Sequence, residues 1–262
     1  MPERSTYLGH CGDVVTSFLR NSGASKVLFV PWALKDWDKY FANPASIAYG
    51  PDGQPLDHTG RPQGRLRELG FESSSIHHAK DPLVAVSEAQ ALFVGGGNGF
   101  RLLKELYKYP GLVELIRSRV LSGKMAFIGS SAGTNAAGQS LHVSICMPIV
   151  KPPTFDALGV VPFLVSPHYH DPENKAALKQ HGMYVGMEET REQRIAQYFE
   201  ERDPGGHPLP VVGLREGGLL EVLGNKAVLH GLRGARVFAP MEGKPTDFNV
   251  GADISAAVGL KK

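Results

Sequence analysis

One serine in this sequence has the surroundings of a nucleophile. Ser131 lies in the stretch GSSAG (129–133), a Gly-x-Ser-x-Gly motif that follows the apolar run 125–128 and precedes a stretch able to form a helix. In a nucleophile elbow the serine occupies a sharp strand-to-helix turn, and its neighbours are small because the backbone is strained and closely packed. A glycine- and serine-rich connecting turn is the alternative for the motif alone, but the strand before it and the helix after it favour a nucleophile.

Three consecutive glycines could hold an anion beside that serine. Gly95, Gly96 and Gly97 follow the apolar run 91–94 and precede Asn98. Glycines leave backbone N–H groups unobstructed, as an anion site requires. Position 100 is not glycine and no Gly-Lys-Ser/Thr follows, so neither the dinucleotide fingerprint nor a Walker loop fits. We expect an oxyanion role, with a tight turn that binds nothing as the alternative.

A serine nucleophile needs a base and a group that orients the base. Among ten histidines, His168 follows the apolar run 163–165, and the carboxyl ends of parallel strands are where α/β sites assemble. Glu216 follows another apolar segment and is a candidate orienting carboxylate. The residues alone leave open His142, His170 and His181 as bases, and Asp156 and Asp171 as carboxylates.

A charged run could recognise a substrate. Residues 188–194 (EETREQR) are predicted to open a helix, with acidic residues in its first turn. Arg191 and Arg194 are three residues apart and would share one face. Either guanidinium could bind a substrate carboxylate through two parallel hydrogen bonds. The alternative, which is the commoner one for a charged run, is a solvent-exposed helix face whose side chains form salt bridges with one another.

The elements that must position these groups follow an α/β pattern. Apolar runs at 27–30, 91–94 and 125–128 read as buried parallel strands. Helical patterns at 82–89, 100–107 and 112–121 alternate with them, which predicts a mostly parallel sheet with helices on both faces. After residue 209, short apolar segments separated by glycine turns, with a hairpin turn at 223–226, predict a β-rich C-terminal part. We expect a single domain over 1–262, with a surface loop at 43–64.

Composition excludes several classes of function. The 262 residues are 42% hydrophobic and carry a net charge of +2 without a basic block, so no nucleic-acid or membrane-surface partner is indicated. Two cysteines, Cys11 and Cys146, cannot make a disulfide framework or a four-cysteine zinc site. The first ten residues lack the apolar core of a secretory signal, and no apolar run approaches the ~20 residues of a membrane span. We expect a cytoplasmic protein.

Taken together, these motifs resemble the peptidase E (alpha-aspartyl dipeptidase) family of serine peptidases. The residues at 129–131 and 213–217 are more similar to those of its animal members than to those of its bacterial members. The resemblance runs from about residue 7 to 238. It is carried by residues 29–31, 37–38, 94–98, 128–135, 147–150, 167–169, 189–194 and 213–217. The segments occur in family order, which is far more specific than any one of them.

The resemblance implies a flavodoxin-like α/β fold and hydrolysis of dipeptides with an N-terminal aspartate, without metal or cofactor, on a small dipeptide substrate. It assigns Ser131 as the nucleophile, His168 as its base and Glu216 as the third member of the triad. It further implies substrate-binding roles for Asn98 and Arg191, and oxyanion N–H groups from Gly96 and Ala132. A homodimer is compatible with this assignment.

The chain departs from the family pattern in two places. Family members carry Asn-Asp immediately before the Met-Pro-Ile-Val segment, where this chain has Ile145 and Cys146. The family's first apolar strand has no counterpart here, so we expect the first strand of the sheet to be missing. The alternatives to an active aspartyl dipeptidase are a catalytically impaired homologue and a related β-aspartyl peptidase of the cyanophycinase type.

Overall fold

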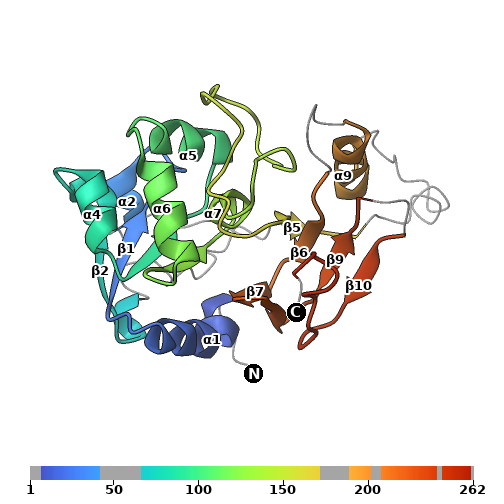
Figure 1. Cartoon of the computed structure of the whole chain (residues 1–262), viewed down its shortest axis with the longest axis horizontal. Coiled ribbons are helices and arrows are strands. Elements are labelled where there is room, and N and C mark those ends of the chain that lie inside the picture. The colour runs from blue at the N-terminus through green and yellow to red at the C-terminus, as the bar shows by residue number, and fades with distance from the viewer. Residues whose placement is uncertain (1–6, 42–65, 172–188, 202–207, 241–243, 261–262) are drawn as a thin grey trace, which may run out of the picture.

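Two four-stranded sheets and a separate hairpin form the framework of the protein (Figure 1). The computed structural model describes residues 7–41, 66–171, 189–201, 208–240 and 244–260. The loop predicted at 43–64 lies outside these ranges, as does His181. None of the described helices is long and apolar enough to cross a membrane.

The first sheet is entirely parallel and has the strand order β2-β1-β3-β4. Its strands are β1 (Lys26–Val30), β2 (Glu72–Ser75), β3 (Ala91–Val94) and β4 (Ala126–Gly129). The three predicted apolar strands are thus confirmed, each to within one residue at either end. Strand β2, with the sequence ESSS, had no apolar signal and was not predicted. It pairs only with β1, so it lies at the edge of this sheet.

Helices cover both faces of this sheet, as predicted. On one face, Leu28 and Val30 of β1 share a buried cluster with residues of three helices. These helices are α4 (Pro82–Glu88), α5 (Gly99–Leu106) and α6 (Leu112–Leu121). On the other face, Val27 packs in a second cluster with Leu19 of α1 (Tyr7–Asn21). Alternate residues of one strand therefore point to opposite layers of helices.

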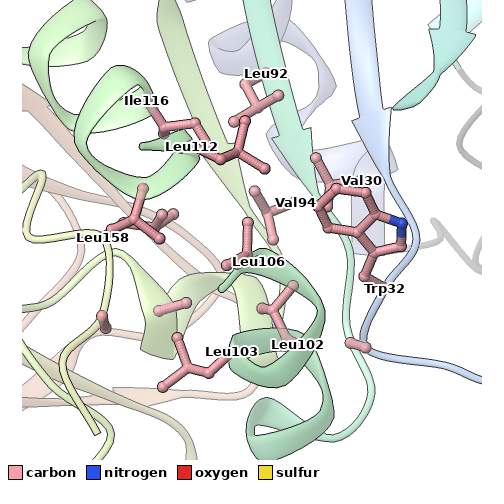
Figure 2. Close-up of a cluster of buried hydrophobic side chains, with 14 of the residues drawn as sticks. Val30, Trp32, Leu92, Val94, Leu102, Leu103, Leu106, Leu112, Ile116 and Leu158 are labelled. Carbon is pink, nitrogen blue, oxygen red and sulfur yellow. The ribbon is translucent and has the colours of Figure 1, made fainter. Parts of the chain in front are cut away.

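Figure 2 shows the larger of these two clusters in detail. Val30, Leu92 and Val94 from β1 and β3 point toward Leu106 and Leu112, and each of these side chains is fully buried. Close packing of these side chains fixes where β3 and β4 end relative to the helices that cover them. The turns that follow those two strands carry the glycine cluster and the candidate nucleophile.

The second sheet has the order β10-β9-β6-β5. Its strands are β5 (Leu164–Tyr169), β6 (Val211–Arg215), β9 (Ala235–Phe238) and β10 (Thr246–Phe248). Strands β5 and β6 are parallel, whereas β9 and β10 run antiparallel to their neighbours. The hairpin β7 (Gly218–Leu223) and β8 (Lys226–Gly231) turns at the predicted place, and helix α9 spans Arg191–Glu200. The β-rich C-terminal part is confirmed.

The parallel strands are divided between the two sheets rather than joined in one. Among the described residues, which begin at α1, β4 and β5 are not paired. The short helix α7 (Ala132–Ala136) bridges the division, because it packs against β4 and β5. Figure 1 accordingly shows α4, α5 and α6 on one side of the molecule and β9, β10 and α9 on the other.

Candidate active site

Ser131 occupies the strained turn that the sequence predicted between β4 and α7. Its φ is 51° and its ψ is −109°, which is an uncommon conformation for a residue with a side chain. The two flanking glycines make the turn possible. A Cβ on Gly133 would lie 2.1 Å from the carbonyl oxygen of Val94, and one on Gly129 would lie 2.6 Å from the carbonyl oxygen of Gly133. The Gly-x-Ser-x-Gly motif is therefore a packing requirement of this turn.

The structure brings Ser131, His168 and Glu216 together. The Oγ of Ser131 lies 2.7 Å from Nε2 of His168, and Nδ1 of that histidine lies 2.6 Å from Oε2 of Glu216. A carboxylate can only accept, so Nδ1 of His168 carries a proton and donates it to Glu216. In the neutral imidazole Nε2 is then bare, and it accepts the hydroxyl proton of Ser131. This is the arrangement of a nucleophile, a base and an orienting acid.

His168 reaches this position through an irregularity in β5. The register between β5 and β6 shifts between Ser166 and Tyr169, and His168 has a φ of 56°. Bulges and positive φ values commonly re-aim a side chain next to an active site. Two residues of the triad, Ser131 and His168, are thus the only described residues other than glycine with positive φ.

The other candidate bases and carboxylates have different partners. His142 bonds to Ser140, and Asp156 accepts a hydrogen bond from Thr154. Asp171 forms an ion pair with Arg215, while His170 is exposed to solvent. Geometry therefore selects His168 and Glu216, which sequence reasoning had ranked but could not separate from these alternatives.

The predicted oxyanion groups lie beside the serine. A Cβ on Gly96 would come within 2.9 Å of Cβ of Ser131, and Ala132 is the first residue of α7, where a helix leaves its N–H groups unpaired. The N–H of Gly96 donates to the hydroxyl oxygen of Tyr40 over 2.8 Å. Burial raises the pKa of Tyr40, so the phenol stays protonated. Sequence reasoning missed Tyr40, since nothing local in its stretch points to a glycine 56 residues away.

The side chain of Asn98 makes two structural hydrogen bonds at this site. Its side-chain oxygen accepts from the N–H of Arg101 and caps α5, and its Nδ2 donates to the carbonyl oxygen of Met147. These two bonds hold the segment containing Met147 next to the glycine turn. The substrate-binding role implied for Asn98 stays a prediction.

Arg191 is the first residue of α9. Thr190 caps the helix through a capping box with Gln193, so the helix starts at Arg191 rather than at residue 188 as predicted. The Nε of Arg191 is buried and has no hydrogen-bond partner among the described residues. Burial, with a further contribution from the charge of Arg194, lowers the pKa of Arg191. An incompletely neutralised guanidinium of this kind favours an anionic ligand.

Cys146 lies against the glycine turn. The Sγ of Cys146 accepts from the N–H of Gly99 at 3.3 Å and lies 3.5 Å from the carbonyl oxygen of Gly97. The thiol of Cys146 therefore has its described partners at Gly97 and Gly99, and the acid beside His168 is Glu216.

A network of ion pairs backs the site, and the sequence did not reveal it. Arg215 binds Asp171 with two hydrogen bonds of 3.0 and 2.6 Å. Arg236 binds Asp247 with bonds of 3.1 and 2.5 Å, and it reaches Glu192 at 2.7 Å. Asp247 also accepts from Arg215, which closes the chain of five residues. Paired guanidinium and carboxylate groups of this geometry hold β6, β9, β10 and α9 in one arrangement.

Comparison with known proteins agrees with this geometry. A model of Peptidase family S51 matches residues 54–230. The chain belongs to peptidase family S51. A protein from Streptomyces coelicolor named Peptidase E is 40% identical over 255 residues, which cover 97% of this chain and 90% of the relative. A Drosophila melanogaster protein named a probable alpha-aspartyl dipeptidase is 39% identical over 232 residues, covering 88% of this chain and 83% of the relative.

A solved structure shows the same fold in another peptidase. The crystal structure of a peptidase from an acI-B1 actinobacterium superposes with a TM-score of 0.60 at 15% identity, covering 95% of this chain and 92% of that one. At this identity the likeness concerns the fold alone. It confirms the α/β architecture that alternating strands and helices predicted.

Proposed function

We propose that this S51 family member is a serine dipeptidase that hydrolyses dipeptides with an N-terminal aspartate through an acyl-enzyme. The observation that carries the proposal is the continuous hydrogen-bonded series from Ser131 through His168 to Glu216. The relatives named Peptidase E and probable alpha-aspartyl dipeptidase support the same reaction class.

The chemistry follows from the protonation states of the triad. His168 Nε2 takes the proton of Ser131 as Oγ attacks the peptide carbonyl carbon, and Glu216 stabilises the imidazolium that forms. The C–N bond then breaks, and His168 passes its proton to the leaving amine. Water repeats the attack on the ester carbon, with His168 as base again, and releases free aspartate and Ser131. In this proposal the backbone N–H of Ala132, at the start of α7, stabilises the negative charge that develops on the carbonyl oxygen. The N–H of Gly96 donates to Tyr40, so it would have to exchange that bond to act as a second oxyanion donor.

Arg191 supplies the basis for aspartate selection in this proposal. Its buried Nε, which has no partner among the described residues, would pair with the side-chain carboxylate of the substrate. A neutral asparagine in the same place leaves this partly buried cation without a counter-charge, which disfavours its binding. We therefore expect strong preference for Asp-Leu over Asn-Leu.

The experiment measures release of free amino acid from Asp-Leu, Asn-Leu and isoaspartyl-Leu by the purified protein. We expect turnover of Asp-Leu that Ser131→Ala abolishes. Ser118→Ala is the matched control, because among the described residues the Ser118 hydroxyl bonds to the carbonyl of Leu115 on α6 and to no group of the site. Cleavage of isoaspartyl-Leu alone would contradict the proposal and establish the β-aspartyl alternative. Absence of turnover on every dipeptide would establish the catalytically impaired alternative.

We propose the cytoplasm as the site of action. Support comes from Cys11 and Cys146, which are both free thiols, as expected in a reducing compartment. Labelling of both thiols in protein isolated under alkylating conditions would support this location, and a disulfide between them would contradict it.

A further inference from the structure

A cluster of two histidines and one aspartate lies outside the catalytic triad. Asp38 is in helix α2 (Trp37–Phe41), and His77 and His78 end the short 3-10 helix η1 (Ile76–His78). Oδ1 of Asp38 lies 3.0 Å from Nε2 of His77 and 2.8 Å from Nε2 of His78. One ligand atom from each of the three residues lies within 4.8 Å of the others. Two segments that are about 40 residues apart in sequence thus converge on one point.

The ring of His77 is held by contacts at both nitrogens. Its Nδ1 lies 2.6 Å from the hydroxyl oxygen of Ser75, which is also within hydrogen-bond distance of the carbonyl oxygen of Phe29. Its Nε2 faces Oδ1 of Asp38 at 3.0 Å, and Nε2 of His78 faces the same oxygen at 2.8 Å. When both Nε2 atoms are unprotonated, their lone pairs and the carboxylate point to one place, where a cation would be coordinated by all three groups.

The donor set indicates which cation fits. Two imidazole nitrogens and one carboxylate oxygen are ligands of zinc and neighbouring transition metals, whereas calcium and magnesium prefer oxygen alone. Bonds of about 2.0–2.1 Å to one ion place adjacent ligand atoms roughly 3 Å apart, close to the spacings found here. We propose that Asp38, His77 and His78 bind a divalent transition-metal ion such as zinc.

Burial of the three groups suits a site that an ion can enter. The side chain of His77 is only 5% exposed, and Ser75 fixes its orientation from behind, as outer hydrogen bonds commonly do for metal-bound histidines. The side chains of Asp38 and His78 are 80% and 56% exposed. One ligand is therefore held in advance, and two face solvent, where water can complete the coordination.

The ion would tie α2 to η1 at a short distance from the triad. Tyr40 is on the same five-residue helix as Asp38, and its hydroxyl receives the N–H of Gly96 beside Ser131. The ion would thereby stabilise the position of Tyr40. The role is structural and lies outside the catalytic steps, so it does not depend on the function proposed above.

The experiment titrates zinc chloride into the untagged, chelator-treated protein by calorimetry, in a buffer that does not bind metal. We expect saturable binding of one ion per chain, with the affinity lowered at least about tenfold in His78→Ala and in Asp38→Asn. His230→Ala is the matched control, since His230 also bonds to a carboxylate, that of Glu221, but has no third ligand in the described structure. It should retain the wild-type affinity.

A second measurement guards against loss of folding. Zinc should raise the Tm of the wild type and of His230→Ala, but not that of His78→Ala, whose exposed position lets the metal-free variant keep the wild-type Tm. Cobalt substitution should give visible absorption bands that His78→Ala abolishes. Absence of saturable zinc binding, or equal affinity in wild type, His78→Ala and Asp38→Asn, would overturn the proposal and leave a purely hydrogen-bonded cluster.

Discussion

Replacing Glu216 with glutamine tests how the triad works. The variant keeps the size of the side chain but removes the charge that lies 2.6 Å from Nδ1 of His168. An amide can also donate, so it no longer forces the proton onto Nδ1 of the imidazole. We expect kcat/KM for Asp-Leu to fall, with KM nearly unchanged, because Glu216 acts on the charge that develops on His168 in the transition state.

The magnitude follows from the exposure of the pair. Loss of the acid from a buried serine-protease triad lowers kcat by about 10⁴. Here the side chains of His168 and Glu216 are 40% and 58% exposed, so water screens their attraction. Two unit charges about 4 Å apart interact by about 1 kcal/mol in water and about 4 kcal/mol at an effective dielectric constant of 20. Since about 1.4 kcal/mol is tenfold in rate, we expect a loss of about 10 to 10³.

The assay is steady-state hydrolysis of Asp-Leu by wild type and Glu216→Gln at several pH values. Glu221→Gln is the matched control, because it removes a carboxylate that bonds to His230 rather than to the triad histidine. The wild-type rate should persist in that control. A rate in Glu216→Gln within threefold of wild type would refute the assignment of Glu216 as the orienting acid, since no compensating carboxylate bonds to His168 in the described structure.

Two further predictions concern stability. Gly133→Ala should lower the Tm by at least about 2 °C and reduce activity, because its Cβ would meet the Val94 carbonyl oxygen at 2.1 Å; thermal unfolding at the wild-type Tm would contradict this. Hydrogen bonds from Arg236, and then from Arg215, lower the pKa of Asp247 from 3.8 to about 2. Its contribution to stability is therefore present above pH 4 and lost as the pH falls toward 2. Because Asp247 is half-exposed, the loss should be below about 1 kcal/mol by urea unfolding at pH 5 and pH 2.5, and an undiminished pH dependence in Asp247→Asn would contradict the assignment.

The parts of the fold that the sequence predicted are those with strong burial. Strands β1 and β3 lie inside the sheet, and their apolar runs report burial on both faces. Strand β4 is the last strand of the described sheet, but its apolar run still packs on both layers, with Phe127 in one cluster and Ala126 and Ile128 in the other. Strand β2 escaped prediction because an edge strand with the sequence ESSS is held by pairing with β1 rather than by apolar side chains. Helix α2 escaped for a similar reason, since five residues are too few to show a helical period.

The candidate site divides in the same way. Ser131 and Glu216 follow the ends of β4 and β6, and His168 lies near the end of β5; apolar runs mark all three strands, so a sequence can propose these residues. Tyr40 and Arg236 cannot be proposed in this manner, because their partners Gly96 and Glu192 are distant in sequence and only the folded chain brings them together. Local pattern proposes the reacting groups, whereas tertiary structure determines which groups lie beside them.

The division of the fold into two sheets has a consequence for the chemistry. Ser131 follows β4 of the first sheet, while His168 and Glu216 belong to β5 and the end of β6 in the second. The distance of 2.7 Å between Ser131 and His168 therefore depends on contact between sheets that share no strand pairing in the described structure. Buried Asn135 of α7 makes that contact, because its Nδ2 donates to the carbonyl oxygen of Val165 in β5 at 2.8 Å. Loosening this junction would separate nucleophile from base while leaving each sheet folded, so activity should be lost before stability.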